Sequence, residues 1–291
     1  MKNITTRNFR ILSDFMDVRE FMVEVYERDW RNGVPAPFLE YALSSDWMDT
    51  SLMHRCRIWE DMGKIAAFVF YENPVSDIYF SLRPEYEELA REMVAYAASD
   101  MPKADGKQKL VLFEGQKAVM DAAERAGYTR CGGYNERVFD FEKSLEYPLP
   151  EGFRFVEPGK LEPEKIDECC WKGFDHEREE GPWNGNGESV RRIMAAPHAT
   201  PFFPVAVEND RQEYVCFAGM WWTPENRLAY MEPLCTVPEY RGRGLASAAL
   251  SELFRRMKPL GASHMTGGGD PFYEKIGFEP CIGWTFWEKV F

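Results

Sequence analysis

The stretch Val237-Pro238-Glu239-Tyr240-Arg241-Gly242-Arg243-Gly244-Leu245-Ala246 decides the fold prediction for this chain of 291 residues. A largely apolar run, 228–236, precedes it, and apolar residues then recur every three or four positions as far as Met257. This pattern predicts a strand, a turn and an amphipathic helix. The first N–H groups of a helix have no partner within it, and the helix dipole places positive charge there. Arg241 and Arg243 add charge, so the stretch predicts a site for a pyrophosphate.

The glycine spacing excludes two other phosphate-binding loops. The dinucleotide fingerprint needs a third glycine where this chain has Ser247, and the nucleoside-triphosphate loop needs a Gly-Lys-Ser/Thr ending, which is absent. The remaining pattern is Arg-x-x-Gly-x-Ala after Val-x-Pro. It resembles the acyl-CoA-binding signature of the GNAT N-acetyltransferase superfamily.

A second motif, Phe272-Tyr273-Glu274-Lys275-Ile276-Gly277-Phe278, follows the first at roughly the spacing of that superfamily. By itself it predicts a short helix that ends at Gly277 and leads into an apolar strand. In the resemblance it is the second conserved block, whose tyrosine stands beside the thioester sulfur. The resemblance covers the C-terminal half well and the rest of the chain more faintly.

The resemblance implies acetyl-CoA as co-substrate and a set of residues that bind it. Asp270 is near the position where many relatives carry an asparagine that contacts the cofactor, although the loop 266–271 is shorter than their usual pattern. The expected cofactor-binding residues are Leu234, Cys235, Thr236, Val237, Arg241, Gly242, Arg243, Gly244, Leu245, Ala246 and Asp270.

Acetyl transfer to an amine needs a base for the amine, donors for the oxyanion and a proton for the departing thiolate. On the strand 228–237, alternation predicts Tyr230, Glu232 and Leu234 on one face. Pro233 lacks an N–H group, which fits the bulge or splay of family members. The free backbone there would pair with the pantetheine arm, and the N–H of Leu234 or Cys235 would polarise the thioester carbonyl.

Glu232 is the candidate general base, acting through a water, and Tyr273 is the candidate acid for the CoA thiolate. The alternatives are that Glu232 is a carboxylate at the rim of the site and that Tyr273 packs on the sheet. Cys235 as a nucleophile would give ping-pong kinetics, but no activating histidine follows a recognisable pattern.

The acceptor site is less defined by sequence. Residues 175–188 form an acidic segment with Trp183 and several glycines, which predicts a mobile loop that holds a cationic amine or is merely solvated. Trp221, Trp222 and Tyr230 either line the same cavity or belong to the core.

Composition restricts the function classes. A formal net charge of −13 argues against nucleic-acid and membrane partners and favours cationic acceptors. Neither a cleavable leader nor a membrane-length apolar run is found, which predicts a soluble, cytoplasmic protein. Seven cysteines and four histidines show no metal-ligand spacing, so no metal is expected.

The chain also repeats itself. Pro84-Glu85-Tyr86 recurs as Pro238-Glu239-Tyr240, and Glu124-Arg125-Ala126-Gly127-Tyr128 resembles Glu274-Lys275-Ile276-Gly277-Phe278, at offsets of 154 and 150 residues. On this repeat, Arg241-Gly242-Arg243-Gly244 becomes Glu87-Glu88-Leu89-Ala90, and Tyr273 becomes Ala123. In the first half both glycines are lost and two carboxylates are present instead. Both changes oppose pyrophosphate binding there.

The predicted class is α/β (α+β), with two tandem GNAT-like domains, each a twisted, mixed, mostly antiparallel sheet flanked by helices. Residues 1–147 would be a degenerate copy, and 148–291 the catalytic domain, joined near the prolines of 143–152. Strands are expected near 51–59, 64–72, 77–82, 109–113, 202–207, 215–222, 228–236 and 263–267. Helices are expected near 14–29, 36–44, 85–98, 116–126, 163–174, 188–195, from 242 onward, and before Gly277.

The predicted function is acetyl-CoA-dependent N-acetylation of a primary amine of a small molecule or peptide, by direct attack in a ternary complex. One alternative is a non-catalytic acyl-CoA-binding regulatory module. Another is an aminoacyl-tRNA-dependent transferase, which the acidic balance and the intact CoA signature oppose. A homodimer is compatible with the sequence.

Overall fold

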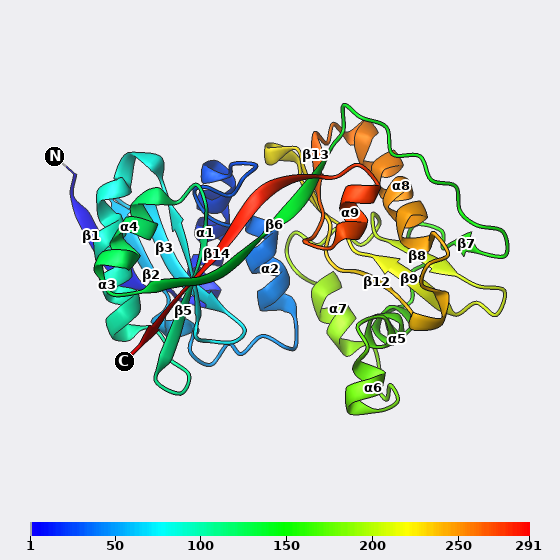
Figure 1. Ribbon diagram of the computed structural model, residues 1–291, viewed down its shortest axis with the longest axis horizontal. Coiled ribbons are helices and arrows are strands. Elements are labelled where there is room, and N and C mark those ends of the chain that lie inside the picture. Colours follow the sequence, from blue (N-terminus) through cyan, green and yellow to red (C-terminus); the bar gives the residue numbers. More distant parts are fainter. Residues whose placement is uncertain (1) are drawn as a thin grey trace. The chain divides into compact units, whose positions relative to one another are not determined.

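The computed structural model describes residues 2–291 (Figure 1). Its internal contacts divide the chain into two compact units: unit 1 comprises residues 2–43, 47–136 and 280–291, and unit 2 comprises residues 44–46 and 137–279. The units are therefore not continuous in sequence. Residues 137–147 lie in unit 2, and the C-terminal residues 280–291 lie in unit 1. That residues 1–147 are a degenerate copy and residues 148–291 the catalytic domain stays a prediction.

The sheet of unit 1 contains most of the long strands. Its order is β1 (Ile4–Asn8), β2 (Arg57–Asp61), β3 (Lys64–Glu72), β4 (Asp77–Leu82), β5 (Lys107–Phe113), β14 (Glu279–Val290) and the start of β6 (Thr129–Asp140). Strands β4 and β5 are parallel, and β1 to β4 are antiparallel neighbours. The continuous apolar run of β3 is buried on both faces, as expected for a central strand.

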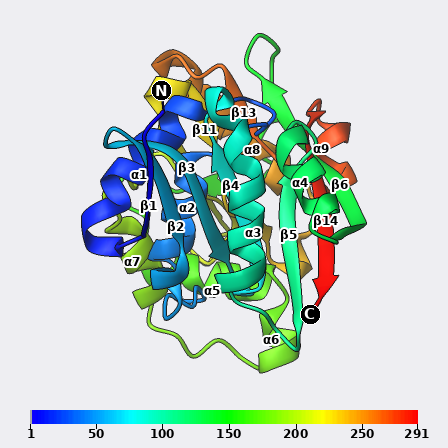
Figure 2. The ribbon, with the colours of Figure 1, turned by 90° about the vertical axis from the view of Figure 1, so that its left-hand side faces the viewer.

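The α-helices of unit 1 are α1 (Ile11–Val25), α2 (Ala36–Ser44, whose last residue belongs to unit 2), α3 (Ala90–Asp100) and α4 (Lys117–Arg125). Helix α1 packs on β3, and Figure 2 shows α3 in front of strands β4 and β5. Sheet and helices together confirm the predicted α/β class for this unit.

Unit 2 contains two smaller groups of strands. In the first, the end of β6 pairs with β13 (His264–Thr266), which lies parallel to β11 (Leu228–Tyr230), and β11 pairs with β10 (Trp221–Thr223). The second is an antiparallel sheet in the order β12 (Leu234–Thr236), β9 (Tyr214–Ala218), β8 (Val205–Glu208) and β7 (Arg154–Phe155). Its helices are α5 (Pro163–Gly173), α6 (His176–Glu180), α7 (Glu188–Met194), α8 (Leu245–Met257) and α9 (Pro271–Lys275).

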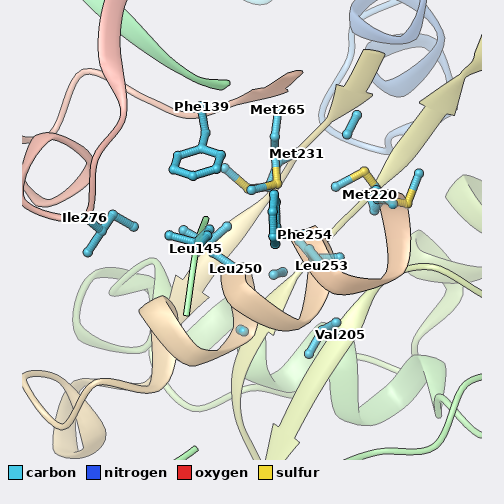
Figure 3. Close-up of a cluster of buried hydrophobic side chains, with 14 of the residues drawn as sticks. Phe139, Leu145, Val205, Met220, Met231, Leu250, Leu253, Phe254, Met265 and Ile276 are labelled. Carbon is cyan, nitrogen blue, oxygen red and sulfur yellow. The ribbon is translucent and has the colours of Figure 1, made fainter. Parts of the chain in front are cut away.

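Helices α5 and α8 cover opposite faces of the sheet that β12, β9, β8 and β7 form. Val205 and Val207 belong to the hydrophobic cluster that contains Leu250 and Leu253 of α8 (Figure 3). Ala206, between them in the strand, belongs instead to the cluster around α5. This alternation follows from the two-residue period of a strand, and α8 also contacts β12.

Several expected elements differ from the structure. The strand expected near 51–59 begins only at Arg57, because Asp49 Oδ1 accepts the N–H of Ser51 at 2.9 Å and favours a turn before it. The helix expected near 14–29 runs from Ile11 to Val25. The expected strands 215–222 and 228–236 are each broken into two. In residues 2–291 no helix is both long and apolar enough to span a membrane.

Candidate active site

Each of the two broken strands of unit 2 passes from one sheet to the other, and the two breaks lie next to each other. Strand β9 ends at Ala218 and β10 begins at Trp221, while β11 ends at Tyr230 and β12 begins at Leu234. Strand β12 pairs with β9, whereas β11 pairs with β13 only through Leu228–His264 and Ala229–Met265. The interruption predicted at Pro233 is therefore present.

Gly219 makes this break possible. Its N–H donates to the carbonyl of Pro233 at 2.7 Å. A Cβ atom at Gly219 would lie 2.0 Å from the carbonyl oxygen of Glu232 and 2.7 Å from Cδ of Pro233. Two backbone segments thus approach so closely that only glycine fits.

The candidate base Glu232 lies in the segment that joins β11 to β12 and is partly exposed. The expected alternation of Tyr230, Glu232 and Leu234 on one strand face is wrong, because the strand is broken between them. Tyr230 and Trp221 are buried core residues, and Trp222 is partly buried.

The turn before α8 has the backbone that an anion site needs. Gly242 and Gly244 have φ of 74° and 83°, which favours glycine, and Gly244 is the N-cap of the helix. The amide of Ala248 donates to the carbonyl of Gly244 at 3.1 Å. The amides of Leu245 and Ala246 precede this first helical bond, and residues 241–244 are exposed.

The two arginines of this turn contact the protein itself. Arg241 donates from Nε to the carbonyl of Thr236 at 3.1 Å and from Nη2 to the carbonyl of Gly173 at 2.8 Å. It also pairs with Asp175 at 3.0 Å. Arg243 lies over the ring of Tyr240 at 5.0 Å. Arg241 therefore ties the turn to β12 and to the end of α5.

Tyr273, the candidate acid, lies against the backbone that follows β13. A Cβ on Gly267 or on Gly268 would come within 2.9 Å of the Tyr273 ring, so both glycines are needed to seat it. The ring also lies 5.2 Å from that of Phe278. The carboxylate of Asp270 caps helix α9 by accepting the N–H of Phe272 at 2.7 Å. In this structure Asp270 therefore has a capping role.

Helix α5 contacts the middle of β12 through small side chains. A Cβ on Gly173 would lie 2.7 Å from Cβ of Cys235, and the sulfur of Cys235 lies 3.8 Å from that of Cys170. Hydrogen bonds from Cys169 and Cys170 hold the pKa of the Cys235 thiol well below its usual range. Sequence reasoning missed this cluster, because 65 residues separate Cys170 from Cys235.

The acidic segment 175–188 is more ordered than expected for a mobile loop. It contains helix α6 and the first residue of α7. Asp167 of α5 accepts the Nε1–H of Trp183 at 3.1 Å and the N–H of Gly187 at 3.2 Å. Trp171 donates to the carbonyl of Gly181 at 3.0 Å. The segment is thereby attached to α5 at its middle and near its C-terminal end.

No group of three or more His, Cys, Asp or Glu side chains is placed to hold a metal ion in the described part of the chain, residues 2–291.

Unit 1 has a parallel strand pair like that of β11 and β13 in unit 2, but it lacks the glycine turn that precedes α8. Asp77–Lys109 and Ile78–Leu110 join β4 to β5 in parallel, as the pairs of β11 and β13 do. The segment Pro84–Leu89 is a 3-10 helix that leads directly into α3, and the amide of Ala90 donates to the carbonyl of Glu87. Beyond the pairing, Gln116 bridges both strands: Nε2 donates to the carbonyl of Phe80 at 2.8 Å, and Oε1 accepts the N–H of Phe113 at 3.1 Å.

Comparisons with known proteins agree with this geometry. Residues 166–278 match the acetyltransferase (GNAT) family. A GCN5-related N-acetyltransferase from Sphaerobacter thermophilus shares the fold, with a TM-score of 0.63, 14% identity, and coverage of 99% of this chain and 95% of that one. No curated protein matches the sequence.

Two further solved structures share the fold over nearly the whole chain. A tandem GNAT protein from the clavulanic acid biosynthesis pathway has a TM-score of 0.65, 13% identity, and coverage of 99% of this chain and 98% of that one. A GNAT-family acetyltransferase from Colwellia psychrerythraea has a TM-score of 0.62, 8% identity, and coverage of 99% and 100%. These likenesses show the fold, and the family match shows the enzyme class. Residues 166–278 therefore carry an acetyltransferase (GNAT) domain, which supports an N-acetyltransferase.

Proposed function

We propose that the chain is an acetyl-CoA-dependent N-acetyltransferase that acetylates a primary amine of a small molecule or peptide by direct attack in a ternary complex. One observation carries this proposal. Strand β12 and strand β13 belong to different sheets, and β12 continues into a turn with two left-handed glycines, whose exposed residues 241–244 lead into α8. This arrangement offers a pyrophosphate site and a strand edge in one continuous segment.

The register of β12 narrows the choice of oxyanion donor. The bonds from Gly219 N–H to the carbonyl of Pro233 and from Val237 N–H to the carbonyl of Val215 lie on the β9 side. By the alternation of an antiparallel ladder, Cys235 also faces β9, and the N–H groups of Leu234 and Thr236 face the other edge. We therefore favour Leu234 over Cys235 as the donor to the thioester carbonyl.

The cofactor would then lie along β12 and the turn. The pantetheine amides would pair with the edge of Leu234 and Thr236, and the diphosphate would accept from the amides between Gly242 and Ala246. Arg241 would act by holding the turn, because its guanidinium already binds two carbonyls.

Glu232 and Tyr273 would supply the proton transfers. Glu232 would accept a proton from the amine through a water, and Tyr273 would donate its phenolic proton to the departing thiolate. An ordinary thiol has a pKa near 8.5 and a phenol one near 10, so this transfer is accessible once the thiolate forms. The side chain of Cys235 faces α5, which favours direct attack over an acyl-enzyme.

Unit 1 would be a degenerate copy that does not bind CoA in this manner. Its turn has no left-handed glycines, and the amide of Ala90 is already bonded. The side chain of Gln116 already hydrogen-bonds to the backbone groups of β4 and β5 with which a pantetheine arm would pair.

The acceptor is expected to carry positive charge. The segment before Gly181 contains Asp175, Glu177, Glu179 and Glu180, and it is attached to the same helix α5 that contacts β12. An amine panel should therefore include compounds with a second cationic group beside compounds with only one.

The test combines calorimetry with CoA and release of free thiol from acetyl-CoA across the amine panel. For Tyr273→Phe we expect unchanged CoA affinity and a kcat lowered by about 10²-fold or more, because a positioned acid contributes roughly that much. Tyr214→Phe, which removes a phenol from the α5 side of the unit, should leave kcat unchanged. Heat with CoA but no thiol release with any amine would favour the regulatory module, and no heat at all would refute the proposal.

A further inference from the structure

Adjacent Cys169 and Cys170 meet Cys235, which is distant in sequence, where α5 packs on the β9–β12 pair, and a fourth cysteine, Cys216, belongs to the hydrophobic cluster on the α8 side of the same sheet. Cys169 and Cys170 lie on α5, Cys235 in β12 and Cys216 in β9. The Sγ atom of Cys235 lies 3.8 Å from Sγ of Cys170 and 3.7 Å from the carbonyl oxygen of Cys169. The hydroxyl of Thr236 lies 3.4 Å from Sγ of Cys216. All four are free thiols.

The members of this cluster differ in accessibility. Cys169, Cys216 and Cys235 are buried, whereas Cys170 is partly exposed. A direct contact from sulfur to sulfur joins Cys170 to Cys235. These two residues come from different elements, so a covalent bond between them would join α5 to β12.

The pKa values of the thiols of Cys235 and Cys170 are shifted in opposite directions. Hydrogen bonds from Cys169 and Cys170, together with the positive charge of Arg241, lower the pKa of Cys235. The same hydrogen bonding raises the pKa of Cys170. Cys235 is thus the more acidic thiol of the pair and the one that reacts more readily with an oxidant on ionising, and Cys170, whose sulfur lies 3.8 Å away, is the neighbouring thiol that can resolve its oxidised product.

We propose that Cys170 and Cys235 form a reversible disulfide, made by a peroxide and opened by a dithiol, that controls acyl-CoA binding in unit 2. The Cys235 thiol gives up its proton and attacks one oxygen of hydrogen peroxide, the O–O bond breaks, a sulfenic acid forms, and the departing hydroxide takes up that proton and leaves as water. Cys170 then attacks the sulfenic sulfur, the S–O bond breaks, and a second water leaves. Two thiols are oxidised, and one peroxide is reduced to two waters.

The effect on CoA follows from how tightly β12 is held, and this part rests on the proposed function. A disulfide bond is about 2.05 Å long, so the two sulfurs must approach from their separation of 3.8 Å. Gly173 has no room for even a methyl group against Cys235, and Arg241 links Gly173 to Thr236. The strain therefore reaches the backbone of β12 and the turn that would bind CoA.

The experiment uses the full chain with Cys131→Ser, because exposed Cys131 would cross-link separate molecules. Reduced protein is treated with stoichiometric hydrogen peroxide, quenched, and examined by intact mass and tryptic mapping. We expect the loss of two hydrogen atoms and a cross-link between the peptides Ile166–Lys172 and Leu228–Arg241. Cys170→Ser should abolish the cross-link, and the matched variant Cys169→Ser should retain it.

Calorimetry with CoA measures the consequence. We expect the dissociation constant to rise at least tenfold on oxidation, to recover with dithiothreitol, and to be insensitive to peroxide in Cys170→Ser. No cross-link, or one that involves the peptide Gln212–Arg227 or requires Cys169, would overturn the disulfide. A cross-link with unchanged CoA affinity would overturn the control. If reduced protein binds no CoA, the proposed function fails, while the mass data still decide the disulfide.

Discussion

Gly219 shows how one residue decides the geometry of the candidate site. Strand β9 could not leave the sheet beside the Glu232–Pro233 segment if position 219 carried a side chain, because its Cβ would lie 2.0 Å from a carbonyl oxygen. A backbone atom cannot move aside as a flexible side chain can. The residue without a side chain is therefore the one that permits β11 and β12 to belong to different sheets.

For Gly219→Ala we expect a loss of about 1–3 kcal/mol of unfolding free energy, the range typical of overpacking. CoA affinity should fall as well, because β12 moves with Pro233. Urea unfolding and calorimetry measure the two effects. Gly132→Ala is the control, since a Cβ there would meet its nearest neighbour at an ordinary 3.6 Å. Equal effects of the two variants would contradict the role given to Gly219.

At the scale of elements, the same strand–turn–helix arrangement occurs in both units with different turns. In unit 2 the turn residues 241–244 are exposed and carry two left-handed glycines, whereas in unit 1 the 3-10 helix Pro84–Leu89 bonds the amide of Ala90 to the carbonyl of Glu87. Two glycines at the helix start account for the contrast, since φ values of 74° and 83° are costly for residues with a Cβ.

Gly244→Ala should therefore weaken CoA binding at least tenfold and destabilise the protein by about 1 kcal/mol. Gly261→Ala is a matched control just beyond the other end of α8, because Gly261 has a φ of 90° and no atom within 4 Å of its Cβ position. The control should show the same loss of stability, measured by thermal unfolding, with unchanged CoA affinity. Weak binding in both variants would mean that stability, not amide geometry, sets the affinity.

Local patterns predicted the elements next to the glycine turn better than those fixed by distant contacts. The spacing of apolar residues placed α8, and Pro233 indicated the broken strand. The second break at Gly219 and the sulfur cluster depend on residues that are remote in sequence, so no local pattern reveals them. The role of Arg241 in holding the turn depends on its hydrogen bonds to the carbonyls of Gly173 and Thr236. Only the folded chain brings these groups together.

At the scale of the whole molecule, two carboxyl groups make a contribution to stability that falls as the pH rises. Burial raises the pKa of Glu72, which accepts a hydrogen bond from Tyr79 at 3.2 Å, to about 7 from a usual value of 4.5, and burial also raises that of Glu136 to about 7. Between these values the folded chain holds protons that the unfolded chain has lost. The stabilisation is thus complete below about pH 4.5 and is lost as the pH rises through 7.

Glu72→Gln should flatten this dependence, because the amide keeps an acceptor for Tyr79 and has no proton to lose. Relative to wild type, the variant should gain up to ~3 kcal/mol between pH 5 and pH 8, the equivalent of its pKa shift. Urea unfolding at the two pH values provides the measurement, with exposed Glu87→Gln as the control. A variant that loses stability with pH as steeply as wild type would contradict the assignment.

The sheet of unit 1 has a consequence for how the protein is made. Strand β14 pairs with β5 from Trp284–Phe113 to Val290–Lys107, and these paired residues of β14 are translated after every residue of unit 2. During synthesis, the inner edge of β5 must therefore wait without its neighbour while more than half of the polypeptide emerges from the ribosome. The first-made part of the enzyme is the last to be completed, and a nascent chain arrested before residue 280 would expose an unpaired apolar edge to chaperones.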